Sequence, residues 1–286
     1  MDKGKLFVVG TPIGNRGDMT PRAIKTLSEV DVIACEDTRV TRGLLTMYGI
    51  KNTVTAYHKF NEREKAADLV RQMTEGKTVA VVTDAGMPCI SDPGAVLVAA
   101  AADAGIEVVA VPGAAAVTAA VALSGFAAVS YVFCGFFGKG EKEIAAALGM
   151  CARAEQEVYV FYESPKRIEK TVSCIEKHLP DARLAVCNDI TKLHERVYRG
   201  TPAQVLAALT ANPNADKGEY AVVLHRGAFV AAAAGAALSL EAQLVQCMVE
   251  NDAGVKDAVA ILTEKLKGAA TKKDIYAAAL ALKKRF

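Results

Sequence analysis

The stretch VVTDAGMPCISDPG, residues 81–94, carries an apolar run directly into a loop of acids, prolines and glycines. The preceding Val79 and Ala80 extend the apolar run backward. A run that stops this abruptly ends at a surface, where small residues expose the backbone and prolines stiffen it. We therefore predict a strand at 79–83 followed by a loop that recognises a small molecule through its backbone.

Alternating strands and helices surround this loop. Thr20 and Pro21 suit the N-cap and the first position of a helix. The alternation predicts a mostly parallel sheet covered by helices on both faces. The expected strands are 6–9, 30–35, near 54, 79–83 and 107–111, and the expected helices are 20–29, 38–48, 61–76, 95–104 and one after Gly113.

A second α/β domain and a small helical extension are expected to follow. The stretch GAFVAAAAGAA, residues 227–237, is interpreted as a linker or a loosely formed helix between them. The predicted domains are 1–124, 125–228 and 239–286. The later strands are expected near 130–134, 157–162, 183–187 and 220–225, and the later helices near 142–152, 166–178, 202–209, 240–251, 256–266 and 272–283.

Composition narrows the class of protein. No apolar run reaches the roughly 20 residues that a membrane helix needs. The 7 cysteines lack paired spacing, which indicates reduced thiols in a cytoplasmic protein and no metal site. Cys35, Cys134 and Cys174 are expected in the core. The net charge of +2 gives no overall basic field, although basic residues outnumber acids from Lys256 onward.

Four loops follow strands of the first predicted sheet: GTPIGN, CEDTR, TDAGMPCISDPG and PGAAA. In an open parallel sheet, ligands bind beyond the carboxyl ends of the strands. The chain lacks both the GxGxxG and the GxxxxGK[ST] patterns, so dinucleotide and P-loop sites have no motif here. The four loops together predict a small-molecule site of another kind.

Five motifs, in this order, resemble the tetrapyrrole methylase superfamily: the stretch from VGTPIGN to EDTR, then DAGMPCISDPG, VPGAAAVTAA, FYESPKRI and ITKLHERVYRG. They are most similar to the members that methylate the ribose 2′-hydroxyl of a cytidine in small-subunit (16S) ribosomal RNA. The resemblance implies a two-domain α/β architecture with a mostly parallel N-terminal sheet, a second α/β domain and a helical C-terminal extension. It also implies a homodimer.

The resemblance further implies S-adenosylmethionine as methyl donor, bound between the two domains. Carried over by motif, contacts with the donor would be mostly apolar or through the backbone. The implied cofactor-binding residues are Ile13, Met87, Ile90, Gly113, Ala114, Tyr162, Cys187 and Tyr220.

The chain departs from the family pattern at three places. It has GMPCISDPG where GTPGISDPG is typical, PGAAA for PGPSA, and NDITK for REITK. Ala115 therefore lacks a possible hydroxyl contact, and Asn188 replaces an arginine. If the donor is recognised by backbone, the change at Ala115 matters little, whereas loss of an arginine that grips RNA would weaken RNA binding.

Methyl transfer to a hydroxyl depends on positioning, and a base can assist it. Candidates for the base are Glu36, Asp37 and Lys192, of which Glu36 and Lys192 are the predicted catalytic residues; Asp37 is equally explained as a helix cap. His58 is interpreted mainly as a structural loop histidine. Predicted RNA-binding residues are Arg39, Lys166, Arg167, Lys272 and Lys273.

Two other functions stay open on the sequence. The chain could methylate a small tetrapyrrole such as a precorrin, or it could bind RNA or cofactor without turnover. The basic C-terminal helices argue against the small substrate, since they would contribute nothing to it. The favoured partner is therefore the ribosomal RNA of the small subunit, without a membrane.

Overall fold

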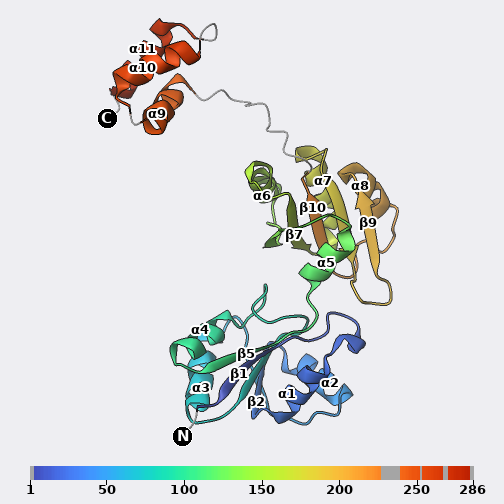
Figure 1. Ribbon diagram of the computed structural model, residues 1–286. Coiled ribbons are helices and arrows are strands. Elements are labelled where there is room, and N and C mark those ends of the chain that lie inside the picture. The colour runs from blue at the N-terminus through green and yellow to red at the C-terminus, as the bar shows by residue number, and fades with distance from the viewer. Residues whose placement is uncertain (1–2, 227–238, 252, 267–269, 284–286) are drawn as a thin grey trace. The chain divides into compact units, whose positions relative to one another are not determined.

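The computed structural model describes residues 3–226, 239–251, 253–266 and 270–283 (Figure 1). The chain divides into two compact units, Met1–Ala228 and Phe229–Phe286. The stretch 227–237, interpreted from sequence as a linker or loose helix, lies outside the described residues. Within the described residues, no helix is both long and apolar enough to cross a membrane.

The first unit contains two five-stranded sheets, and all strand pairs in the first sheet are parallel. This confirms the parallel sheet predicted from the alternating elements. The strand order is β3-β2-β4-β1-β5. The strands are β1 Lys5–Val9, β2 Val32–Cys35, β3 Val54–Ala56, β4 Val79–Val82 and β5 Glu107–Val111.

Helices cover both faces of the first sheet. Residues 79 and 81 of β4 join one apolar cluster, with Leu69 and Leu97 of its helices, while Ala80 and Val82 join another, with Leu27. This alternation is what a strand buried on both faces requires. The helices are α1 Pro21–Glu29, α2 Thr38–Met47, α3 Glu62–Thr74 and α4 Ala95–Asp103.

The helix starts follow the capping signals in the sequence. The side chain of Thr20 accepts a hydrogen bond from the backbone N–H of Ala23 at 3.1 Å, with Pro21 at the first helical position. The carboxylate of Asp37 caps α2 by accepting from the N–H of Arg39 at 2.8 Å. The capping interpretation of Asp37 is therefore confirmed.

The second sheet has the order β6-β7-β10-β8-β9. Strands β6 and β7 are parallel, and the other neighbours are antiparallel. The sequence did not predict β9, an edge strand whose pattern RVYRG is charged and short. The strands are β6 Val132–Phe136, β7 Val158–Glu163, β8 Arg183–Asn188, β9 Arg196–Gly200 and β10 Tyr220–His225.

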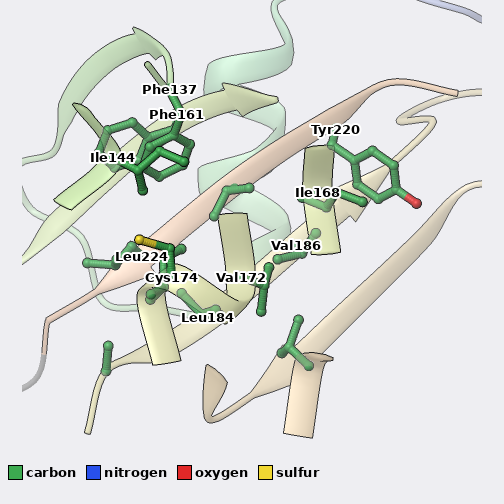
Figure 2. Close-up of a cluster of buried hydrophobic side chains, with 14 of the residues drawn as sticks. Phe137, Ile144, Phe161, Ile168, Val172, Cys174, Leu184, Val186, Tyr220 and Leu224 are labelled. Carbon is green, nitrogen blue, oxygen red and sulfur yellow. The ribbon is translucent and has the colours of Figure 1, made fainter. Parts of the chain in front are cut away.

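Each face of the second sheet has its own core. One face packs with Ile144, Leu148 and Val172 from the helices that cover it (Figure 2). The other face packs against Val117 and Ala120 of α5, Ala116–Ser124. Helix α5 follows β5 of the first sheet in the chain but covers the second sheet. The helices on the first of these faces are α6 Glu141–Arg153, α7 Ile168–His178 and α8 Pro202–Thr210.

The second unit consists of three short helices around a core of their own. Leu244, Val259, Leu262 and Ile275 are buried in this core. The helices are α9 Leu240–Glu250, α10 Val255–Lys265 and α11 Lys272–Lys283, which confirms the predicted helical extension.

One cysteine prediction is wrong. Cys35 and Cys174 are buried as expected, but Cys134 is exposed. Cys134 lies on β6, the edge strand of the second sheet. One side of an edge strand has no neighbouring strand to cover it, which the local sequence does not reveal.

Candidate active site

The predicted loops meet at the carboxyl ends of the first sheet. The N–H of Thr11 donates to the carbonyl of Gly86 at 2.9 Å, and the N–H of Gly86 donates back at 3.2 Å. The loop after β1 is thus fastened to the loop after β4. The two segments form one continuous backbone surface, as the sequence predicted for a ligand site at this edge.

Two of the glycines allow close packing between loops. A Cβ on Gly10 would lie 2.7 Å from the backbone nitrogen of Gly113, and a Cβ on Gly113 would lie 2.9 Å from the carbonyl carbon of Gly10. Only glycine allows the loops after β1 and β5 to approach this closely.

The loop of residues 84–94 has an unusual backbone. Cys89 and Ser91 both adopt positive φ, at 71° and 66°, a conformation that costs free energy for non-glycine residues. The N–H of Gly94 donates to Glu62 at 3.1 Å, which fixes the end of the loop. Such strain at a ligand-facing loop favours a functional role.

Residues of the second sheet close the site. The N–H of Asn15 donates to the hydroxyl of Thr191 at 3.0 Å. A Cβ on Gly14 would lie 2.5 Å from Cγ of Lys192. Asp189 and Thr191 also have positive φ. The motifs GTPIGN and NDITK, far apart in the sequence, therefore contact each other.

Between these elements lies a pocket of about 370 Å³, within the range of about 300–1,000 Å³ usual for small-molecule sites. The loops of the first sheet, the start of α5 and the ends of β6, β7 and β10 all contribute to its wall. The lining residues are Ile13, Ala85, Gly86, Met87, Ile90, Ser91, Asp92, Ala115, Ala116, Phe136, Tyr162, Glu163, Ser164, Pro165, Ile190, Glu219, Tyr220 and Ala221.

Five of the eight predicted cofactor contacts line the pocket: Ile13, Met87, Ile90, Tyr162 and Tyr220. The other three do not. Gly113 packs on Gly10, Ala114 precedes the lining residue Ala115, and Cys187 is fully buried in the core between β8 and α5.

Acidic side chains gather beside the pocket. Asp92 lines it, and Glu36 and Asp84 lie close enough to influence each other's charge. Burial raises the pKa of Asp92, the hydroxyl of Thr83 opposes this, and Asp84 adds to it. Burial and then Asp84 and Asp92 raise the pKa of Glu36. A raised pKa makes a carboxylate a better proton acceptor, and such shifts are common at functional sites.

Lys192 forms two ion pairs next to the pocket. Its ammonium lies 3.0 Å from the carboxylates of Asp189 and of Glu219, and Glu219 is a lining residue. Burial lowers the pKa of Lys192, but the hydrogen bonds that its ammonium donates to both carboxylates outweigh burial and leave the pKa raised. A lysine held protonated is a poor base, so the structure favours a positioning role for Lys192.

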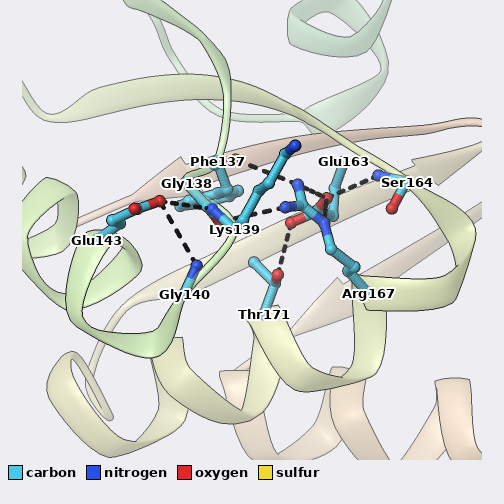
Figure 3. Close-up of polar contacts among 9 residues, drawn as sticks. All are labelled: Phe137, Gly138, Lys139, Gly140, Glu143, Glu163, Ser164, Arg167 and Thr171. Atoms are coloured by element: carbon cyan, nitrogen blue, oxygen red, sulfur yellow. Dashed lines mark hydrogen bonds and ion pairs between the residues drawn. The ribbon is translucent and has the colours of Figure 1, made fainter.

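The motif ESPKRI builds a buried ion pair (Figure 3). The carboxylate of Glu163, with no exposed side-chain surface, accepts from the guanidinium of Arg167 and from the hydroxyl of Thr171 at 2.6 Å. Arg167 also donates to the carbonyls of Phe137 at 3.1 Å and Gly138 at 3.3 Å. Because these internal partners occupy its guanidinium, we do not retain Arg167 as an RNA contact.

The other predicted RNA contacts are exposed. Arg39 pairs with Asp37, yet its side chain is 87% exposed. Hydrogen bonds from the side chain and backbone of Arg39 lower the pKa of Asp37 to about 2, which disfavours Asp37 as the base. Lys166, Lys272 and Lys273 are exposed as well.

Two other positions considered from the sequence, Asn188 and His58, do not line the pocket. Asn188 is buried and donates to the carbonyls of Lys217 and Glu219, so a surface contact with RNA is not available there. Nδ1 of His58 is buried without a partner among the described residues, and His58 does not line the pocket.

The sequence did not single out Asp92, Phe136, Glu163 or Glu219 as site residues. Asp92 had a usable signal, since it is an acid within a Gly-Pro loop at a strand end. Phe136 and Glu163 end β6 and β7, and Glu219 directly precedes β10. Only the tertiary arrangement brings these three residues to the pocket.

Comparison with known proteins identifies the family. Residues 5–206 match the family described as Tetrapyrrole (Corrin/Porphyrin) Methylases. The chain belongs to the tetrapyrrole methylase family. It is therefore a methyltransferase, and the resemblance inferred from the motifs is confirmed.

Two relatives are called ribosomal RNA small subunit methyltransferase I. The one from Bacillus subtilis is 40% identical over 78% of this chain and 75% of its own length. The one from Thermotoga maritima is 42% identical over 77% of this chain and 98% of its own length.

Solved structures agree on the tetrapyrrole methylase fold. A diphthine synthase superposes with a TM-score of 0.58 at 16% identity, covering 78% of this chain and 90% of its own. The methyltransferase CobJ superposes with a TM-score of 0.57 at 18% identity, covering 79% and 95%. At these identities the likeness shows the fold alone.

The methyl donor is S-adenosylmethionine, and the pocket fits it. Small residues such as Ala85, Gly86 and Ala116 leave backbone groups open to a ligand. The carboxylates of Asp92 and Glu219 provide negative charge for a cationic sulfonium. The residues that would hold the donor are Ile13, Met87, Ile90, Tyr162 and Tyr220, together with the backbone of the small lining residues.

Proposed function

We propose that this methyltransferase transfers the methyl group of S-adenosylmethionine to the 2′-hydroxyl of a cytidine ribose in 16S ribosomal RNA. The observation that carries this proposal is the pocket built from the family motifs. The names of the relatives from B. subtilis and T. maritima support the small-subunit substrate. A ribosomal RNA substrate would place the activity in the cytoplasm, and the homodimer stays a proposal that rests on the family resemblance alone.

The donor is held mainly by apolar side chains and backbone. Ile13, Met87 and Ile90 reach the pocket from the first sheet, and Tyr162 and Tyr220 from the second. When bound, the donor supplies the electrophilic methyl group. Binding between elements of two sheets fixes its orientation, and positioning of this kind supplies much of the rate of such a displacement.

We assign the role of general base to an acidic residue beside the pocket rather than to Lys192. Asp92 lines the pocket and Glu36 neighbours it, so Asp92 is the better placed acceptor for the hydroxyl proton. Glu36 keeps a supporting role through its charge. Lys192 instead positions Glu219 at the pocket wall.

RNA contacts are proposed at exposed cations. Arg39 lies at the start of α2, next to the carboxyl end of the first sheet, and Lys166 in the turn before α7. Lys272 and Lys273 lie in the first turn of α11. Cations at a helix start are unfavourable for the helix dipole, so their place there favours an anionic partner over a stabilising role.

The test uses small subunits whose target cytidine lacks the methyl group, together with radiolabelled S-adenosylmethionine. We expect label in 16S RNA, with the position of the methyl group read by mass spectrometry of nucleosides. Label in a precorrin but not in subunits would favour the small tetrapyrrole substrate. Donor binding without any transfer would favour a binding module.

A further inference from the structure

Phe136 is an exposed aromatic ring at the donor pocket. Of the three aromatic residues that line the pocket, Tyr220 is buried and Tyr162 is half-buried, whereas Phe136 is 59% exposed. Burying a phenylalanine typically gains about 1.5–3 kcal/mol, a gain that this ring largely forgoes. Its position is therefore not explained by packing of the core.

A β-bulge aims this ring at the pocket. Phe133 pairs with Val160 and Phe136 pairs with Tyr162. Phe136 is therefore three residues beyond Phe133 on β6, whereas its partner is only two residues beyond Val160 on β7. Gly135 takes the extra step with a φ of 68°. In a regular strand, residues 133 and 136 would face opposite sides. The bulge turns both toward Tyr162, with ring centroids 4.8 Å and 5.6 Å away.

The chain after Phe136 is held firmly. The ring of Phe137 stacks on Phe161 at 3.8 Å on the other face of the sheet. Arg167 donates to the carbonyls of Phe137 and Gly138 (Figure 3). The ion pair between Arg167 and Glu163 thus holds the chain that follows Phe136 and helps to fix the direction of its ring. Bulges that redirect a side chain are frequent beside active sites.

Ile90 supplies a second exposed apolar side chain to the same pocket. It lies between Cys89 and Ser91, the two non-glycine residues of positive φ in the loop after β4. Both loop and bulge therefore use unusual backbone geometry to present an apolar side chain at the pocket.

An RNA substrate explains such a ring. A ribose can reach a donor inside a pocket only if its nucleotide leaves the stack, and unstacked bases of RNA are received by aromatic side chains. We propose that Phe136 stacks on the base of the nucleotide to be methylated, with Ile90 as a further apolar contact. This proposal rests on the proposed methylation of RNA. It adds a binding position for the nucleobase, at Phe136, that none of the sequence motifs indicates.

The first experiment measures methyl transfer to small subunits by Phe136→Ala, Phe136→Leu and Phe136→Tyr, with donor affinity by calorimetry. Stacking by a single aromatic residue predicts a loss of about 10–100-fold in kcat/KM for Ala and Leu. Tyr should stay within about threefold of the wild type, since it keeps the ring. Donor affinity should not change in any variant.

Phe60→Ala is the matched control. Phe60 is 97% exposed and does not line the pocket, so its loss should leave methyl transfer unchanged. Because Phe136 is also exposed, all variants are expected to fold, which thermal unfolding checks.

Three results would overturn the proposal. Full activity of Phe136→Leu would show that a ring is not needed. A loss of donor affinity equal to the loss of kcat/KM would assign the ring to the donor. A change in molar mass by light scattering would make it a contact between copies. If the wild type itself transfers no methyl to subunits, the proposed function fails first.

A second experiment uses the absence of tryptophan from the chain. Phe136→Trp introduces the only indole, whose fluorescence reports stacking. A single-stranded oligoribonucleotide containing cytidine should quench it in the presence of S-adenosylhomocysteine, and the control Phe60→Trp should be unaffected. Equal quenching by S-adenosylhomocysteine alone would contradict a contact with the RNA base.

Discussion

At the scale of single residues, Asp92 differs from the other acids because it both lines the pocket and has a raised pKa. We expect Asp92→Asn to lower the single-turnover rate by about 10²–10⁴-fold, the usual contribution of a general base. Glu36→Gln should lower it less, and donor binding by calorimetry should hold in both. Unchanged rates in both variants would leave positioning alone as the mechanism.

The pH dependence gives an independent prediction about the same site. A base works only when deprotonated, so the rate should fall as the pH drops through the raised pKa of Asp92. Asp84→Asn removes a negative neighbour and should lower that pKa, which moves the acid limb of the rate profile to lower pH. Asp103→Asn, an exposed acid at the end of α4, is the control and should leave the profile in place.

Ala115 tests backbone recognition of the donor. It occupies the N-cap of α5 without a capping side chain, and it lines the pocket. Ala115→Ser should add a cap and raise the free energy of unfolding by about 1 kcal/mol, measured by urea denaturation. Donor affinity should barely change. The control Ala116→Ser gains no cap, and a large loss of affinity in Ala115→Ser would defeat backbone recognition.

At the scale of elements, the ion pair of Glu163 and Arg167 joins the end of β7 to the turn before α7. Arg167→Ala would leave a fully buried carboxylate unpaired and should cost about 3–5 kcal/mol of stability. Lys177→Ala removes the exposed pair with Glu141 and should cost at most about 1 kcal/mol. Equal losses in urea denaturation would show that burial of Glu163 is unimportant.

Replacing two glycines by alanine should have opposite effects on stability, because Gly10 is closely packed and Gly43 lies in a helix with open space around it. Gly10→Ala would force a Cβ to 2.7 Å from the backbone of Gly113, so we expect destabilisation and weaker donor binding. Gly43 lies within α2 with nothing near its missing Cβ. Gly43→Ala should therefore stabilise by up to about 1 kcal/mol. Thermal unfolding of both variants decides, and a stable Gly10→Ala would contradict the packing argument.

At the scale of the whole molecule, the second unit has a core separate from those of the first. Truncation after Ala228 should keep donor affinity and weaken RNA binding, since Lys272 and Lys273 are lost. The salt dependence of RNA binding should also become flatter, because fewer counterions are released.

For this truncated chain, calorimetry measures the affinity for the donor, and binding assays at several salt concentrations measure the affinity for RNA. Misfolding of the first unit, or an unchanged salt slope, would contradict the separate RNA-binding role of the second unit.

The sequence by itself determined most of the helices and strands, and the family. Alternation of apolar runs, the caps at Thr20 and Asp37, and the Gly-Pro loop of residues 84–94 act over a few residues, so local patterns record them. Motifs in a fixed order gave the methylase resemblance for the same reason. Five predicted donor contacts line the pocket because they lie in or beside those motifs.

Only the tertiary structure decided the rest. The exposure of Cys134, the burial of Cys187 and the internal pairing of Arg167 depend on neighbours distant in the chain. So does Phe136, whose direction comes from a bulge against β7 and whose role comes from a pocket shared with the first sheet. Burial and charge pairing are set by which segments meet in space, and no local pattern of residues encodes that meeting.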